Sequence, residues 1–182
     1  DAATDSAALE RAAADAERAW RAEAQRVSKA RQLAAPRLAD AVTQAMQQLG
    51  MAGGRFEVAL IAQDEPQSFG LESVELRVAG HAGSTPRALA KVASGGELSR
   101  LALAIAVTTC HSGAVQGAAM PTLIFDEIDA GVGGSVAYQV GRLMKQLGGM
   151  SQVLAVTHLA QVAACADHHF VVAKSLQGQA TV

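Results

Sequence analysis

Two short apolar segments of this chain end in residues that could take part in catalysis. Thr122–Phe125 is followed directly by Asp126 and Glu127, and Val153–Thr157 is followed by His158. If both segments are parallel strands, these side chains meet at the edge of the sheet where open parallel sheets bind their ligands. A carboxylate placed like Asp126 suits Mg²⁺, and one placed like Glu127 could polarise a water molecule. An Asp-Glu pair by itself more often marks a solvated loop, so the assignment depends on a third motif.

The third motif is the run from Ser94 to Glu97, which opens an apolar helix. Ser94 as the N-cap and Glu97 at the third helical position form a capping box. Capping does not explain Gly95 and Gly96, because each glycine in a helix costs on the order of 1 kcal/mol relative to alanine. Bare N–H groups at a helix N-terminus, with a serine hydroxyl beside them, form a site suited to phosphate. We therefore expect this turn to bind a phosphate group.

The elements that position these motifs follow from the hydrophobic pattern. Helices and fully apolar strands are predicted to alternate along the second half of the chain, at 98–110, 122–125, 135–147, 153–156, 159–165 and 170–173. This alternation indicates an α/β fold with a mainly parallel sheet covered by helices on both faces. Upstream, residues 56–60 and 74–78 alternate apolar and polar side chains, which predicts two antiparallel strands.

A long helix is predicted at the start of the chain. Residues 6–34 contain neither Gly nor Pro, and their apolar side chains recur at steps of three and four residues. Such a helix would span roughly 40 Å, which is long for a compact domain and favours a coiled-coil stub over the alternative, a single surface helix. Pro36 is predicted to kink or interrupt the helix before a second apolar stripe that ends at Gly50.

Composition excludes some classes of protein. Hydrophobic residues make up 50% of the chain and the formal net charge is −2, so composition gives no argument for nucleic-acid binding. Cys110 and Cys165 lack metal-type spacing and fit free thiols in the cytoplasm, and no apolar run is long enough for a membrane span. The chain begins at Asp1 without Met and its last residues resemble the start of a strand, so we expect both ends to be cut.

The signature, Walker-B, D-loop and switch-histidine motifs of ATP-binding-cassette ATPases resemble, in the same order, Ser94–Glu97, Thr122–Glu127, Ile128-Asp129 and His158. The fuller runs Ala93–Arg100, Phe125–Val132 and Val156–Ala163 are similar to the RecN family of SMC-like bacterial DNA repair ATPases. The resemblance implies that residues 1–35 are a stub of the coiled-coil arm. It also implies that residues 36–182 are the C-terminal lobe of the ATPase head.

The resemblance further implies a role for each motif residue. Asp126 would support Mg²⁺, Glu127 would activate the attacking water, and His158 would sense the γ-phosphate of ATP. Asp129 would lie at the seam between two heads. The signature residues would contact ATP held by the partner head, and they are Ser94, Gly95, Gly96 and Glu97.

A P-loop requires Gly-Lys followed by Ser or Thr, and none of the lysines in this chain follows a glycine. In the resembled heads the P-loop lies in the N-terminal lobe. We therefore expect the intact protein to be an ATPase of double-strand break repair in the cytoplasm, associated with the nucleoid and not with a membrane. Its expected partners are the N-terminal lobe, a second identical head and DNA, whereas this chain alone is expected to be inactive.

Two alternatives stay open. One is the nucleotide-binding subunit of a transporter, although such subunits usually have Gln in place of Glu97 and lack a long Ala-rich helix upstream. The other is a structural clamp that uses the same head for assembly without hydrolysing ATP.

Overall fold

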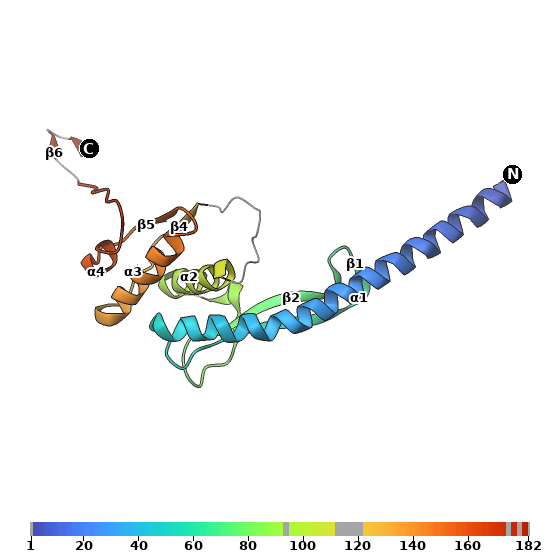
Figure 1. Ribbon diagram of the computed structural model, residues 1–182, viewed down its shortest axis with the longest axis horizontal. Coiled ribbons are helices and arrows are strands. Elements are labelled where there is room, and N and C mark those ends of the chain that lie inside the picture. Colours follow the sequence, from blue (N-terminus) through green and yellow to red (C-terminus); the bar gives the residue numbers. More distant parts are fainter. Residues whose placement is uncertain (1, 93–94, 112–121, 174–175, 178–179, 182) are drawn as a thin grey trace.

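The fold is seen in a computed structural model that describes residues 2–92, 95–111, 122–173, 176–177 and 180–181 (Figure 1). One long helix, α1 (Ala2–Gln48), lies along a β-hairpin and reaches the other helices with its C-terminal turns (Figure 1). The N-terminal part of α1 projects away from the rest of the chain (Figure 1). None of its described side chains before Ala24 is buried. This projection agrees with the arm that the sequence predicts.

Pro36 lies inside α1 and does not interrupt it. A proline in a helix removes one hydrogen bond and crowds the preceding turn, at a cost of about 3 kcal/mol. Pro36 is exposed, so water can reach the carbonyl group that loses its partner. The later turns of α1 bury Val42, Met46 and Leu49 in the core, which stabilises the helix beyond the proline. Of the predicted kink or interruption at Pro36, the interruption is therefore wrong, and Figure 1 shows a gentle bend along α1. No break in α1 marks a division at residue 35.

The two antiparallel strands predicted from the alternating pattern are confirmed, and they are longer than expected. β1 (Arg55–Gln67) pairs with β2 (Gly70–Ala79), with Phe56 opposite Val78. Gly70 has a φ of 111°, a conformation that glycine adopts without strain, and it closes the tight turn between the strands. A short β3 (Arg87–Ala88) pairs with β2 and is followed by the 3₁₀ turn η1 (Leu89–Lys91).

A polar cluster joins α1 to the hairpin. Ser28 donates a hydrogen bond to the Glu72 carboxylate, and Arg31 Nη1 donates to the Glu72 carbonyl oxygen at 3.0 Å. Ser28 and Glu72 are both buried. The hydrogen bonds give partners to the Ser28 hydroxyl and to one oxygen of the Glu72 carboxylate, and Arg31 Nη1 lies 3.6 Å from the other oxygen. These contacts fix the position of α1 on the hairpin.

The predicted parallel strands are also confirmed. β4 (Leu123–Phe125) and β5 (Val153–Ala155) pair in parallel and are connected through α3 (Gly134–Gly148), as a crossover between parallel strands requires. α4 (Ala160–Ala163) follows β5. The chain ends in the short antiparallel pair β6 (Leu176–Gln177) and β7 (Ala180–Thr181).

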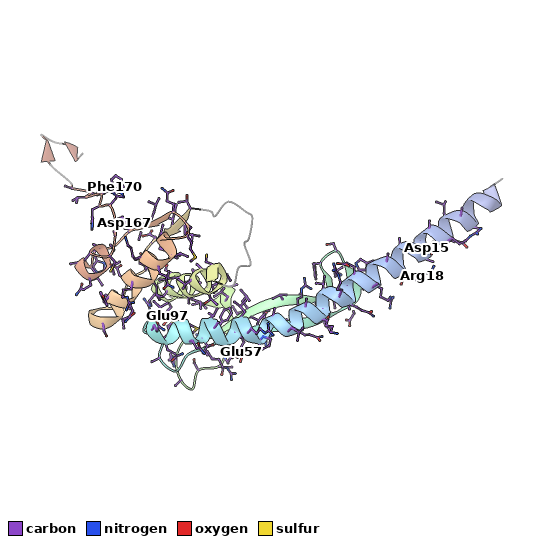
Figure 2. The ribbon with its side chains drawn as sticks, in the orientation of Figure 1. Asp15, Arg18, Glu57, Glu97, Asp167 and Phe170 are labelled. Atoms are coloured by element: carbon purple, nitrogen blue, oxygen red, sulfur yellow. The ribbon has the colours of Figure 1, made fainter. Side chains whose placement is uncertain are left out.

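The strand predicted at 170–173 is wrong. These residues form no strand, and the side chain of Phe170 is 91% exposed on the segment that leads away from the helices (Figure 2). A strand needs a neighbour to complete its hydrogen bonds, and in the described part of the chain this segment pairs with none.

The core lies where α2 (Gly95–His111) packs between α1 and α3. Its largest fully buried side chains come from all three helices, the hairpin and the loop after β4, and they are Met46, Leu49, Phe56, Leu101, Leu103, Ile128 and Leu147. The prediction that the parallel sheet is covered on both faces is not met within the described residues, because Ile124 of β4 is 70% exposed and Val156 is also exposed. No described helix combines the length and the apolar character that crossing a membrane requires.

Candidate nucleotide-binding and catalytic site

The first turn of α2 packs directly against the loop that follows β4. A Cβ atom at Gly96, which is buried, would lie 2.9 Å from the carbonyl oxygen of Ala130 and 3.0 Å from its Cβ. A Cβ atom at Gly95 would lie 2.9 Å from Glu127 Oε2. The two glycines therefore allow a close approach of helix and loop, a reason for glycine that the sequence did not reveal. Ser94 lies outside the described residues.

The loop after β4 presents both predicted carboxylates at the C-terminal end of the strand. Asp126 and Glu127 are exposed. Ser99 Oγ of α2 donates a hydrogen bond to the Asp126 carbonyl oxygen at 2.7 Å, and Glu127 N donates to Asp126 Oδ1 at 3.0 Å. Glu127 has a φ of 53°, a left-handed conformation that costs about 1–2 kcal/mol for a residue with a side chain. The surrounding hydrogen bonds hold this strained turn in place.

Arg100 of α2 holds the same loop further along. Its Nη1 atom donates a hydrogen bond to the Ala130 carbonyl oxygen at 2.8 Å, and the residue is buried. Burial lowers the pKa of the Arg100 guanidinium, and the nearby Glu97 carboxylate opposes that shift. Glu97 lies in the first turn of α2, near the junction of the hairpin and the helices (Figure 2). Arg100 therefore ties α2 to the end of the loop.

Asp129 connects the loop after β4 to the segment after β5. It is 2% exposed, and its Oδ2 atom accepts hydrogen bonds from Thr157 Oγ1, from His158 N at 3.0 Å and from Leu159 N at 3.2 Å. Burial acts to raise the pKa of Asp129, but the hydrogen bonds from Thr157, His158 and Leu159 and the nearby imidazole outweigh it. The pKa of Asp129 consequently lies below its usual value. Asp129 is thus a buried carboxylate that is stable in its ionised form.

His158 stands beside Asp129 at the surface. The distance from His158 Nδ1 to Asp129 Oδ2 is 3.3 Å, and the imidazole side chain is 71% exposed. The parallel register brings this segment next to the β4 loop, because Val156 N donates a hydrogen bond to the Phe125 carbonyl oxygen at 3.0 Å. The expected meeting of the two strand ends at one edge therefore occurs.

The predicted site residues that the structure describes all lie in this one region, and they are Gly95, Gly96, Glu97, Asp126, Glu127, Asp129 and His158. The hydrogen bonds that join the elements carrying these residues come from the side chains of Ser99, Arg100 and Thr157. The sequence predicted no role for these three residues. Ser99 and Arg100 directly follow the signature motif, which is a signal that could have identified them. Thr157 precedes His158 without any motif of its own.

A groove of about 280 Å³ lies beside the site, between α2 and β4. Its lining is mostly apolar and reaches Asp126, and it includes Leu98, Phe125 and the exposed Ile124. An apolar groove that borders the Asp126 carboxylate is suited to contact with another protein surface.

The comparisons with known proteins agree with this geometry. No protein-family model matches the chain. The chain is 42% identical over 158 residues to the DNA repair protein RecN of Deinococcus radiodurans, which covers 87% of this chain and 27% of that protein. It is 45% identical over 149 residues to the DNA repair protein RecN of Haemophilus influenzae, covering 81% of this chain and 26% of that protein. The chain belongs to the RecN family. It spans about a quarter of the length of these RecN relatives.

Solved structures confirm the fold expected for a RecN-family segment. The chain is similar to the Smc head domain of Pyrococcus furiosus, crystallised with an extended coiled coil and bound to the C-terminal domain of ScpA. The TM-score is 0.51 at 25% identity, over 71% of this chain and 30% of that one. The Smc head domain of Pyrococcus yayanosii, with a coiled coil and joint, gives a TM-score of 0.55 at 24% identity, over 83% of this chain and 26% of that one. The predicted α/β head lobe with a long preceding helix is therefore confirmed.

Proposed function

We propose that this chain is the C-terminal half of the ATPase head of an SMC-like DNA repair protein. The observation that supports this most is the meeting of three motifs at one edge. The first turn of α2, the Asp126-Glu127 loop and the His158 segment are joined by hydrogen bonds through Ser99, Arg100 and Asp129. These motifs are far apart in the sequence, so an accidental resemblance of one short run does not explain them together.

The residues present fit Mg²⁺ and the phosphates of ATP. Asp126 offers an exposed carboxylate, the oxygen ligand that Mg²⁺ prefers, and Ser99 fixes the backbone behind it. Mg²⁺, when bound, supplies positive charge to the phosphate oxygens. Gly95 is exposed and leaves the start of α2 without a side chain, where the helix favours an anion, whereas Gly96 packs against Ala130.

The catalytic groups are Glu127 and His158 in this proposal. The exposed Glu127 carboxylate accepts a proton from the attacking water and orients it, as a general base does. The exposed His158 imidazole contacts the γ-phosphate as a hydrogen-bond donor or a charged group. In this proposal the loop that carries Asp129 lies at the seam between the two heads.

The chain acts with other parts of the protein in this proposal. It contains no Gly-Lys-Ser/Thr motif, so the N-terminal lobe supplies the P-loop, and a second identical head supplies nucleotide to the signature turn. The exposed Ile124 and Val156 and the adjoining groove provide an apolar surface for the N-terminal lobe. The full-length protein acts on DNA in the cytoplasm, at the nucleoid.

The test uses the full-length protein and measures ATP turnover. Glu127→Gln is expected to abolish turnover and to trap ATP-bound dimers, which size-exclusion chromatography with light scattering detects. Glu65→Gln, an exposed position on the hairpin, is the matched control and keeps wild-type turnover. Unchanged hydrolysis in Glu127→Gln would contradict the proposal and favour the non-hydrolysing clamp. The isolated chain is expected to bind ATP weakly and to hydrolyse none.

A further inference from the structure

We propose that Asp129 is a positioning residue that holds His158 in its working orientation and couples it to the loop that carries Glu127. The inference rests on the proposed function, because it assigns His158 a role in ATP turnover. It concerns contacts within a single head, in addition to any part Asp129 has at the seam between heads.

The contacts of Asp129 fix three consecutive residues. Its Oδ2 atom accepts hydrogen bonds from the Thr157 hydroxyl and from the backbone N–H groups of His158 and Leu159, at 3.0 and 3.2 Å for the two backbone donors. Thr157 Oγ1 also accepts a hydrogen bond from Leu159 N at 3.1 Å. Hydrogen bonds to an ionised carboxylate are roughly twice as strong as those between neutral groups. The backbone that carries His158 is therefore fixed from inside the protein.

The same carboxylate also lies beside the imidazole ring. His158 Nδ1 lies 3.3 Å from Asp129 Oδ2, and an ionised carboxylate can only accept hydrogen bonds. Nδ1 therefore faces the carboxylate, and Nε2 is the ring nitrogen left for a ligand. An imidazole that carries a proton on both nitrogens can pair with Asp129 through Nδ1 and donate to a phosphate oxygen through Nε2. Since the side chain is 71% exposed, Nε2 is accessible from solvent.

The loop that carries Asp129 is held on its other side as well. Arg100 of α2 donates a hydrogen bond to the carbonyl oxygen of Ala130 at 2.8 Å, and Ala130 N donates to the Glu127 carbonyl oxygen at 3.0 Å. Glu127, Asp129 and Ala130 thus belong to one turn that is attached both to α2 and to the segment after β5. A shift of this turn moves Glu127 and His158 together. Asp129 makes the attachment on the His158 side.

The contacts also set Asp129 apart from an ordinary surface aspartate. It is 2% exposed, so its carboxylate faces the segment after β5 and is shielded from solvent. Asp167, by contrast, is exposed and pairs with Lys145 on the far end of α3. Asp167 provides a matched position for the same change of side chain.

The experiment measures steady-state ATP turnover of the full-length protein in a double-mutant cycle. Asp129→Asn is expected to lower kcat by on the order of tenfold to a hundredfold, the usual effect of removing a group that orients a functional imidazole, and to leave KM within about twofold. In a His158→Gln background, Asp129→Asn is expected to cause no further loss, because the residue it positions is already absent. Asp167→Asn is the control and keeps wild-type kcat.

Equal losses of kcat from Asp129→Asn in both backgrounds would show a general structural role and overturn the inference, as would an unchanged kcat. If Asp129→Asn does not fold, Thr157→Val removes one donor and keeps the carboxylate. It is expected to lower kcat several-fold in the wild-type background only, and any other result overturns the inference. Loss of turnover in Glu127→Gln with no effect of Asp129→Asn would reject the inference alone. Unchanged turnover in Glu127→Gln would reject the proposed function and the inference with it.

Discussion

The two glycines of the first turn of α2 allow a direct test of why the chain has glycine there. At Gly96, an added methyl group would lie 2.9 Å from the Ala130 carbonyl oxygen and 3.0 Å from the Ala130 Cβ. Both atoms belong to a loop that Arg100 holds in place, so the loop cannot move away freely. At Gly95, the obstacle is Glu127 Oε2 at 2.9 Å, the end of an exposed side chain that can rotate.

The size of the effect follows from two opposing terms. Crowding of a packed contact costs about 1–3 kcal/mol, and replacing Gly by Ala in a helix gains up to about 1 kcal/mol. We therefore expect Gly96→Ala to lower the free energy of unfolding by about 0–3 kcal/mol. Gly95→Ala should raise it by about 0–1 kcal/mol. Because the gain in helix propensity is common to both variants, they should differ by about 1–3 kcal/mol.

The assay is urea-induced unfolding of this chain, followed by far-ultraviolet circular dichroism, with the transition midpoints of both variants compared with wild type. The slopes of the transitions should agree, so the midpoints report stability. Equal midpoints for the two variants, or a lower midpoint for Gly95→Ala, would refute the argument from close packing. In that case the close approach of helix and loop would not account for the two glycines.

Three further predictions concern other parts of the molecule. Gly141→Ala places a Cβ atom 2.7 Å from Cys165 Sγ and 3.2 Å from the Val162 Cα. It should therefore lower the free energy of unfolding by about 1–3 kcal/mol in the same urea assay. A neutral result would contradict the tight packing of α3 on α4. Ile124→Ser should leave the stability of this chain within about 0.5 kcal/mol, since the side chain is exposed. The same change should destabilise the full-length protein in thermal unfolding if the N-terminal lobe covers Ile124, and equal melting temperatures would speak against that contact. Asp129→Asn should weaken the acid dependence of unfolding, because a lowered carboxyl pKa gives stability that is complete above the ordinary aspartate value and is lost as the pH falls below it. Urea midpoints measured from neutral pH downward should therefore fall more steeply for wild type than for the variant.

Much of the site could be predicted because its polar residues directly follow apolar runs that are recognisable in the sequence as strands. The apolar runs before Asp126 and His158 fixed two parallel strands, and strand direction then placed both ends at one edge. The burial of Asp129 could not be predicted in this way. Its partners at 157–159 lie almost thirty residues further along, and only the register of β4 on β5 brings them together.

The errors also have physical causes. Pro36 carries a local preference against helix, and packing of the later turns of α1 overrides it. The apolar run 170–173 has the composition of a strand, but a strand forms only where another strand can complete its hydrogen bonds. Local sequence therefore predicted which residues favour an element, and the neighbours available in space decided whether it formed.

The length of α1 has a mechanical consequence. A helix of 47 residues is a rod of roughly 70 Å, and only its C-terminal part is anchored, through Ser28, Glu72 and the buried turns near Met46. The unanchored part from Ala2 to Ser28 is roughly 40 Å long, so a rotation of about 10° at Ser28 would carry its tip through roughly 7 Å. Small rearrangements among α2, the hairpin and the loop after β4 would thus be magnified along α1. The anchored C-terminal turns of α1 pack against α2, and α2 is hydrogen-bonded to the loop that carries the candidate catalytic residue Glu127. The helix can therefore act as a lever between that loop and its own far end.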